Sequence, residues 1–102
     1  MGTGNRIIAF FVTKRAAALA ERLKELYPGM NTVRFATKAV EEAWEQADAL
    51  AFIMASGVVV RTIAPLLRDK RTDPAVVVID EAGRYAVSLL SGHLGGANEK
   101  AR

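Results

Sequence analysis

The sequence contains no cysteine, a single histidine and no long apolar run. The absence of cysteine excludes a disulfide framework, a thiolate nucleophile and a zinc site built on thiolates. No run approaches the roughly 20 apolar residues of a membrane helix. The first apolar run, residues 7–12, is too short for the core of a signal peptide and is soon followed by Lys14 and Arg15. We therefore expect a cytoplasmic protein with no membrane partner.

A strong excess of charge of one sign is also missing. The chain has 14 Lys and Arg against 11 Asp and Glu, which gives a net charge of +3. This excess is too small to indicate a nucleic-acid partner, and the basic residues lack interleaved aromatic side chains for base stacking. The length of 102 residues, 51% of them hydrophobic, predicts one α/β domain spanning residues 1–102.

Apolar runs alternate with segments of helical periodicity. The runs predict strands at residues 6–12, 31–36, 49–55 and 75–79. Apolar positions three and four residues apart predict helices at 14–26, 38–46 and 58–67, with Thr13 and Thr37 as caps of the first two. The third segment is also rich in β-branched residues, and Pro65 requires a kink or a new helix start within it.

A loop of hairpin length at residues 80–84 contains glycine and leads into a fifth strand at 85–90. Strands that alternate with helices imply a parallel, right-handed, doubly wound sheet. The predicted fold is therefore α/β, with a small three-layer, mostly parallel sheet and a C-terminal antiparallel hairpin strand.

Ser56 and Gly57 follow the third predicted strand. In open α/β sheets, ligands bind outside the carboxyl ends of the strands. Backbone N–H groups at this turn, together with a bidentate contact from Arg61, are suited to a carboxylate. The alternative is a simple helix cap beside a solvated arginine.

A glycine-rich turn around the only histidine follows the fifth strand. Ser91 and His93 suggest a nucleophile and a base, although residues two apart do not usually face each other. Backbone N–H groups at Gly92, Gly95 and Gly96 can approach an anion closely. The alternatives are a turn histidine bonded to the backbone and ordinary turn glycines. Because the fifth strand runs antiparallel, the turn that follows it can instead lie at the opposite edge of the sheet from the other loops.

Residues 68–74 form a charged loop that includes Lys70 and Arg71. These cations are candidates for binding an anionic ligand, and the alternative is a solvated loop with internal ion pairs. Asp69, Asp73 and Asp80 match no known cation-binding loop spacing, so no metal site is predicted.

Three stretches closely resemble the cobalamin-biosynthesis family CbiG, the cobalt-precorrin-5A hydrolases. They are SGVVVR at residues 56–61, DKRTDPAVVVIDE at 69–81 and LLSGHLGGANE at 89–99. The resemblance implies a cobalt-bearing corrinoid substrate whose δ-lactone is opened with release of acetaldehyde. It implies no protein cofactor, because the substrate carries the cobalt.

Lactone opening needs an activated water and a place for the developing oxyanion. On the motif positions, the resemblance makes His93 the candidate base, with Ser91 beside it. It implies substrate-binding residues at Ser56, Gly57, Arg61, Lys70, Arg71, Gly92, Gly95, Gly96 and Asn98.

Other functions stay open at this point. The chain can be a non-catalytic corrinoid-binding or interaction module, or a generic anion-binding regulatory domain. Full-length members of the family continue into a further domain beyond the point matching Arg102. The resemblance therefore leaves open whether this chain is active alone, and an uncovered sheet edge would favour a homodimer.

Overall fold

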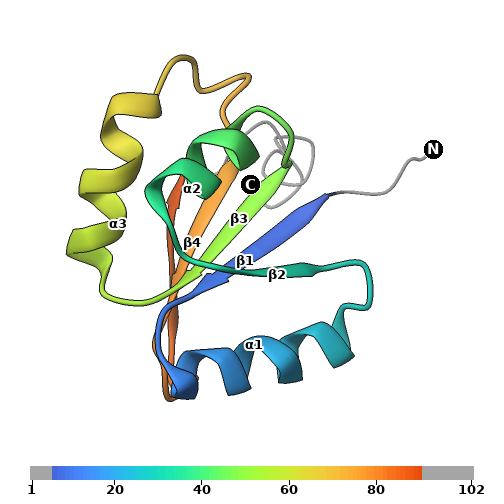
Figure 1. Ribbon diagram of the computed structural model, residues 1–102. Coiled ribbons are helices and arrows are strands. Elements are labelled where there is room, and N and C mark those ends of the chain that lie inside the picture. The colour runs from blue at the N-terminus through green and yellow to red at the C-terminus, as the bar shows by residue number, and fades with distance from the viewer. Residues whose placement is uncertain (1–5, 91–102) are drawn as a thin grey trace.

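The computed structural model describes residues 6–90, and the account that follows concerns these residues (Figure 1). The elements in chain order are β1 (Ile7–Phe11), α1 (Lys14–Leu26), β2 (Asn31–Arg34), α2 (Thr37–Trp44), β3 (Ala49–Ile53), α3 (Ser56–Ile63), a 3₁₀-helix (Ala64–Leu66), β4 (Ala75–Ile79) and β5 (Ala86–Leu90). The sheet order is β2-β1-β3-β4-β5, with β1 to β4 parallel and β5 antiparallel to β4. The predicted α/β fold is confirmed.

Helices cover both faces of the sheet (Figure 1). On one face lies α1, whose fully buried Ala16 and Ala20 pack against Ile53 of β3. These small side chains let the helix axis come close to the strands. On the other face, Trp44 of α2 and Val59 of α3 belong to the main core cluster. The sheet is therefore the middle of three layers.

A stack of two phenylalanines forms the centre of the main cluster. Phe10 of β1 and Phe52 of β3 are register partners, both fully buried, and their ring centroids lie 5.2 Å apart. Phe35, just after β2, lies edge-on to both rings at centroid distances of 6.5 and 6.4 Å. Such aromatic contacts add to the free energy gained from burial alone. They join three strands on one face of the sheet.

The predicted helix at residues 58–67 is confirmed in kind and differs in its bounds. It begins at Ser56, and Pro65 lies in the 3₁₀-helix that follows its end. A proline cannot supply the N–H that would continue the α-helix, so the chain tightens at that point. Thr13 caps α1 as predicted, accepting a hydrogen bond from the Ala16 N–H at 3.0 Å. The prediction for Thr37 is wrong, because Ala36 occupies the cap position of α2.

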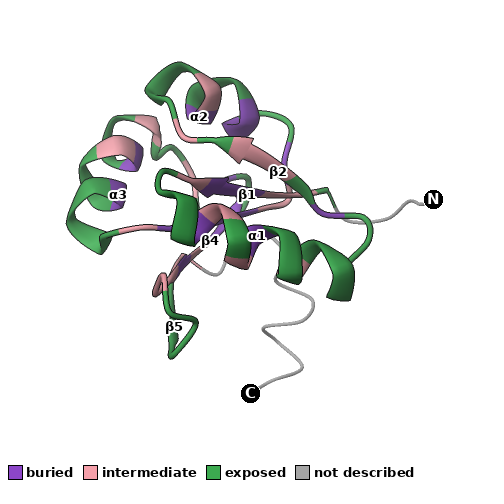
Figure 2. Ribbon diagram, turned by 60° about the horizontal axis from the view of Figure 1, so that its bottom comes forward, coloured by how far each residue is buried: buried purple, intermediate pink, exposed green. Residues whose placement is uncertain are grey.

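The last strand, β5, is an edge strand with little cover (Figure 2). Its first three residues are exposed, and Leu89 and Leu90 are half-buried. The pairing register shifts between Val76 and Val77 of β4, and both leucines pack against the main core cluster. An irregularity of this kind allows consecutive side chains to reach the same face. Within residues 6–90, no helix has the length and apolarity needed to cross a bilayer.

Replacing the central aromatic ring with a smaller side chain tests this packing. Phe52→Leu should lower the free energy of unfolding by about 1–3 kcal/mol, because it removes buried contacts and leaves a small cavity. Urea unfolding followed by circular dichroism measures the change. Val87→Ala, at a side chain that is 47% exposed, is the control and should change it by less than about 0.5 kcal/mol. Equal effects at the two positions would contradict the assignment of Phe52 to the core.

Candidate functional site

The carboxyl ends of β1 to β4 lie at one edge of the sheet, together with the loop that joins β4 to β5. From this edge α1 leaves β1 toward one face, while α3 leaves β3 toward the other (Figure 1). The two strands are neighbours. Where adjacent parallel strands send their helices to opposite faces, the loops separate and leave a crevice, which is the usual ligand site of such sheets.

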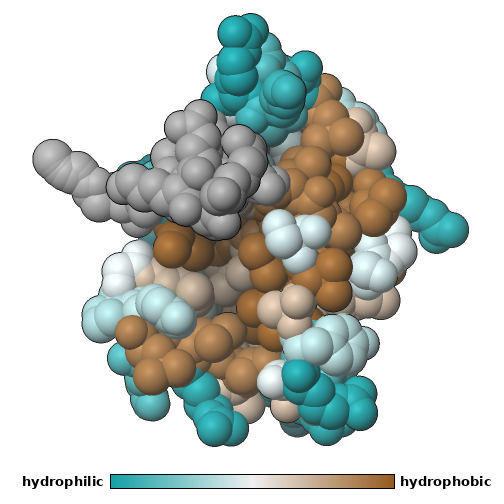
Figure 3. Space-filling model, turned by 180° about the vertical axis from the view of Figure 1, so that it is seen from behind, coloured by the Kyte–Doolittle hydropathy of each residue, from teal (hydrophilic) through white to brown (hydrophobic). Residues whose placement is uncertain are grey.

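A groove of about 680 Å³ lies at this edge. Three segments that are far apart in the sequence form it: the start of α1, the β3–α3 junction and the β4–β5 hairpin. Its apolar lining residues include Met54, Ala55, Val78, Val87 and Leu89. Figure 3, seen from behind, shows apolar surface gathered around β5. The groove therefore offers an apolar wall to a ligand.

Polar side chains line the same groove, namely Arg15, Ser56, Asp80, Glu81 and Arg84. Three of them come from the β4–β5 hairpin, and the other two are in the first turns of α1 and α3. A mostly apolar hollow with a few fixed polar groups is typical of small-molecule sites.

The hairpin loop is held by the carboxylate of Asp80. This group accepts hydrogen bonds from the Arg84 Nε at 3.0 Å and from the Ala82 N–H at 3.1 Å. The Arg84 guanidinium, which donates to it, keeps the pKa of Asp80 below its usual value. Gly83 has a φ of 74°, in the left-handed region that glycine adopts without strain. The loop conformation thus depends on both the ion pair and the glycine.

A second contact fixes the hairpin to the start of α1. The Thr13 hydroxyl donates to Glu81 Oε2 at 2.9 Å and accepts from the Ala16 N–H at 3.0 Å. One side chain therefore caps the helix and holds the loop after β4. This link sets the positions of two of the three segments that form the groove.

The predicted residues at the β3–α3 junction lie partly in the groove. Ser56 lines it, and Gly57 follows in the first turn of α3, where no side chain caps the backbone N–H groups. Arg61 is in the last turn of the helix, is exposed and is not among the lining residues. Arg61 follows Gly57 by one helical turn on the same side of α3, and it lies outside the groove that Ser56 lines.

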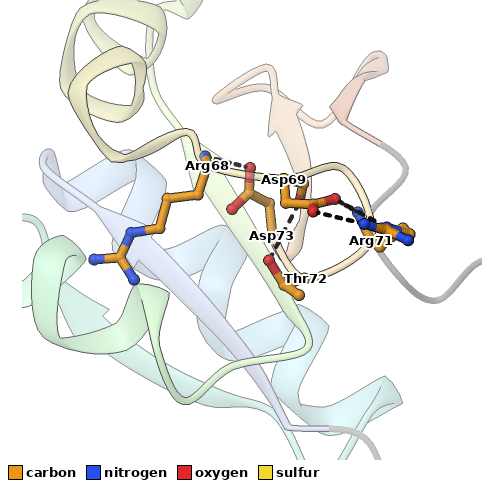
Figure 4. Close-up of polar contacts among 5 residues, drawn as sticks. All are labelled: Arg68, Asp69, Arg71, Thr72 and Asp73. Carbon is orange, nitrogen blue, oxygen red and sulfur yellow. Dashed lines mark hydrogen bonds and ion pairs between the residues drawn. The ribbon is translucent and has the colours of Figure 1, made fainter.

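The loop with Lys70 and Arg71 precedes β4, so it lies at the opposite edge of the sheet. Arg71 is paired with Asp69, whose carboxylate lies 3.2 Å from an Arg71 terminal nitrogen and accepts from the Arg71 N–H at 2.8 Å (Figure 4). These hydrogen bonds lower the pKa of Asp69. The buried carboxylate of Asp73 accepts from the Arg68 N–H at 2.9 Å. The loop thus contains the internal ion pair that the alternative interpretation expected.

The predicted residues Ser91, Gly92, His93, Gly95, Gly96 and Asn98 lie outside the described residues. The described chain ends at Leu90, whose partner is Val76 in the first half of β4. This end of β5 is thus at the same edge as the loop of Lys70 and Arg71. Leu89, one residue before this end, lines the groove, so the groove extends along β5 toward this edge.

Most of the residues that line the groove were not predicted as site residues from the sequence, and the charged residues Arg15 and Glu81 are among them. Both are explained by their positions directly after strand ends, since Arg15 follows the Thr13 cap of β1–α1 and Glu81 follows Asp80 at the end of β4. The order of the elements along the sequence already places both residues just after strand ends. They could be assigned to one site only once the strand order showed that β1, β3 and β4 are neighbours in the sheet.

The strand order 2-1-3-4-5, with helices on both faces and a groove at the carboxyl edge, defines the class. It is a doubly wound, flavodoxin-like domain whose last strand is reversed. Such folds host many activities, so function has to be argued from the site and from relatives.

Comparison with known proteins identifies the family. The family model named cobalamin synthesis G N-terminal matches residues 38–102. A cobalt-precorrin-5A hydrolase from Salmonella typhimurium is 43% identical over 94% of this chain, and one from Priestia megaterium is 58% identical over 58% of it. The crystal structure of a cobalamin biosynthesis protein G homolog from Sulfolobus solfataricus matches with a TM-score of 0.75 and 31% identity, over 95% of this chain and 32% of that one.

The chain therefore belongs to the CbiG family and corresponds to the N-terminal domain of the cobalt-precorrin-5A hydrolases. It spans 31% of the length of the Salmonella relative and 16% of the Priestia relative.

The Asp80–Arg84 pair predicts a change in acid stability. Because the pKa of Asp80 is lowered in the folded state, its carboxylate stabilises the fold above the unfolded-state pKa. That contribution is lost as the pH falls through the lowered pKa. Between about pH 5 and about pH 2, thermal unfolding of Asp80→Asn should therefore shift less than that of the wild type.

Arg84→Ala removes the partner and is the matched control. It should flatten the pH dependence in part, because the Ala82 N–H still donates to Asp80, and the double variant should behave like Asp80→Asn. Asp69 keeps its pair with Arg71 in all of these proteins. A wild-type pH dependence in Asp80→Asn would contradict the assignment.

Proposed function

We propose that this chain supplies the corrinoid-binding N-terminal part of a cobalt-precorrin-5A hydrolase, which opens the δ-lactone of its substrate and releases acetaldehyde. The observation that carries the proposal is the 43% identity to the Salmonella hydrolase over nearly the whole chain. Because the chain spans 31% of that protein, the complete reaction is assigned to the longer protein.

The groove supports a corrinoid ligand by its chemistry. A corrinoid presents an apolar ring system edged by acetate and propionate carboxylates. The groove offers an apolar wall at Met54, Val78 and Leu89, with Ser56 and arginines beside it. Apolar contact supplies affinity, while the few polar groups orient the ring. We therefore place one edge of the corrinoid in this groove.

For the chemical step we assign His93 as the general base, assisted by Ser91. Water adds to the lactone carbonyl as the base takes its proton, and the acyl–oxygen bond breaks to leave a carboxylate on the ring and a hydroxyl on the two-carbon unit. The hydroxyl then loses its proton and becomes the C=O of acetaldehyde, while the carbon–carbon bond from this unit to the ring breaks and its electron pair stays on the ring, where it is protonated. Backbone N–H groups at Gly92, Gly95 and Gly96 are the proposed oxyanion donors.

In the same proposal, Gly57, Arg61, Lys70, Arg71 and Asn98 contact the peripheral groups of the substrate. Lys70 and Arg71 lie at the opposite edge of the sheet from Ser56, so they reach carboxylates on a different part of the ring. The cobalt belongs to the substrate, and the protein needs no cofactor of its own.

A visible-absorbance titration of the chain with a cobalt corrinoid that has free carboxylates tests the proposal. We expect saturable binding that weakens with salt, because charged contacts are screened. Arg61→Ala should raise the Kd several-fold, and Glu21→Ala, at an exposed position on α1, should not. Absence of binding by a chain shown to be folded by circular dichroism would refute the corrinoid assignment for this domain.

The assignment of His93 is tested by turnover. In a chimera in which this chain replaces the matching part of the Salmonella relative, acetaldehyde release is measured with His93→Ala and His93→Gln. A general base contributes about 10²–10⁴-fold, so kcat should fall at least about 100-fold with little change in corrinoid affinity. If kcat survives and only affinity falls, His93 is a binding residue and the base lies elsewhere.

A further inference from the structure

The first turn of α1 has an unusual charge pattern for a helix start. It contains Lys14 and Arg15 and no acidic residue. The start of a helix carries a partial positive charge, so cations in the first turn are unfavourable and acidic side chains are preferred. A local rule broken in this way, next to a groove, is typical of a functional position.

Of the other charged residues that line the groove, Asp80 and Arg84 form an ion pair, and Glu81 has no ion-pair partner among the described residues. Arg84 is paired with Asp80 at 3.0 Å, and Glu81 accepts a hydrogen bond from Thr13. Among the residues that the structure describes, no carboxylate forms an ion pair with Arg15. A guanidinium that lines a ligand groove without such a partner has its five donors available for one.

The position of Arg15 is fixed at its backbone. Thr13 caps the helix two residues earlier and is tied to Glu81 of the hairpin, so the first turn cannot shift without breaking both hydrogen bonds. Apolar side chains such as Met54 line the same groove. Arg15 is exposed in the free domain. A ligand that fills the groove would cover part of it, and an ion pair shielded from water in this way is stronger than one on an open surface.

We propose that Arg15 binds a carboxylate of the ligand in this groove, and that this contact makes the domain prefer corrinoids with free carboxylates over their esters. The inference rests on the proposed function for the identity of the ligand. The geometry of a guanidinium matches a carboxylate through two parallel hydrogen bonds.

Removing the charge of Glu81 should change the affinity for an anionic ligand in the opposite direction. Its carboxylate lines the same groove and repels an anionic ligand, while one oxygen accepts from Thr13. Glu81→Gln keeps an acceptor for that hydrogen bond and removes the charge. Affinity for the acidic ligand should therefore increase in this variant and decrease in Arg15→Ala.

The experiment titrates the chain with cobyrinic acid and with its methyl ester, followed by visible absorbance. Arg15→Ala should raise the Kd of the acid roughly 10-fold or more, since a hydrogen bond to a charged group is lost, and should leave the Kd of the ester unchanged. Arg22→Ala is the matched control, because it removes the same charge from an exposed position on α1 outside the groove. Arg15→Glu should raise the Kd of the acid further. The thermal midpoint of this variant should not fall, since an acidic residue suits the helix start.

An unchanged Kd in Arg15→Ala, or an equal loss in Arg22→Ala, overturns the role of Arg15 and leaves the proposed function intact. If the wild type binds neither corrinoid, the proposed function fails. The role of Arg15 in anion binding is then tested with 8-anilinonaphthalene-1-sulfonate, an apolar ring system with one anionic group. Fluorescence enhancement that falls in Arg15→Ala and not in Arg22→Ala supports the anion contact, and equal enhancement in all three proteins overturns it.

Discussion

The need to bury both faces of the central strands governs this structure. Residues along β1 and β3 are apolar in succession, and Phe10, Phe52 and Ile53 are inaccessible to solvent. Such strands are stable only when helices cover the sheet from both sides. Therefore α1 must leave β1 toward one face and α3 must leave β3 toward the other. The crevice between their starts, where the groove lies, is a consequence of core packing.

Reversal of the last strand decides at which edge of the sheet each end of β5 lies. Because β5 pairs antiparallel with β4, the hairpin loop stays at the groove and Leu90 is carried to the opposite edge. Ser56 and the loop of Lys70 and Arg71 thus lie at different edges of one sheet.

Stability and binding make different demands on the start of α1. The Thr13 hydroxyl caps α1 by accepting from the Ala16 N–H, and it donates a hydrogen bond to Glu81 of the hairpin. Arg15, two residues after that cap, adds a cation where the helix favours an anion. In the proposed complex, a carboxylate of the ligand would offset this unfavourable charge.

The sequence by itself determined the elements and the family. Local periodicity predicted β4 at its observed bounds and the Thr13 cap, since both depend on neighbouring residues. The motif at residues 56–61 carried the family resemblance that the relatives confirm. Only the tertiary structure decided which residues share a site. Arg15 and Glu81 meet at the groove, and Arg61 does not, because strand order and the direction of β5 arise from contacts between residues far apart in the chain.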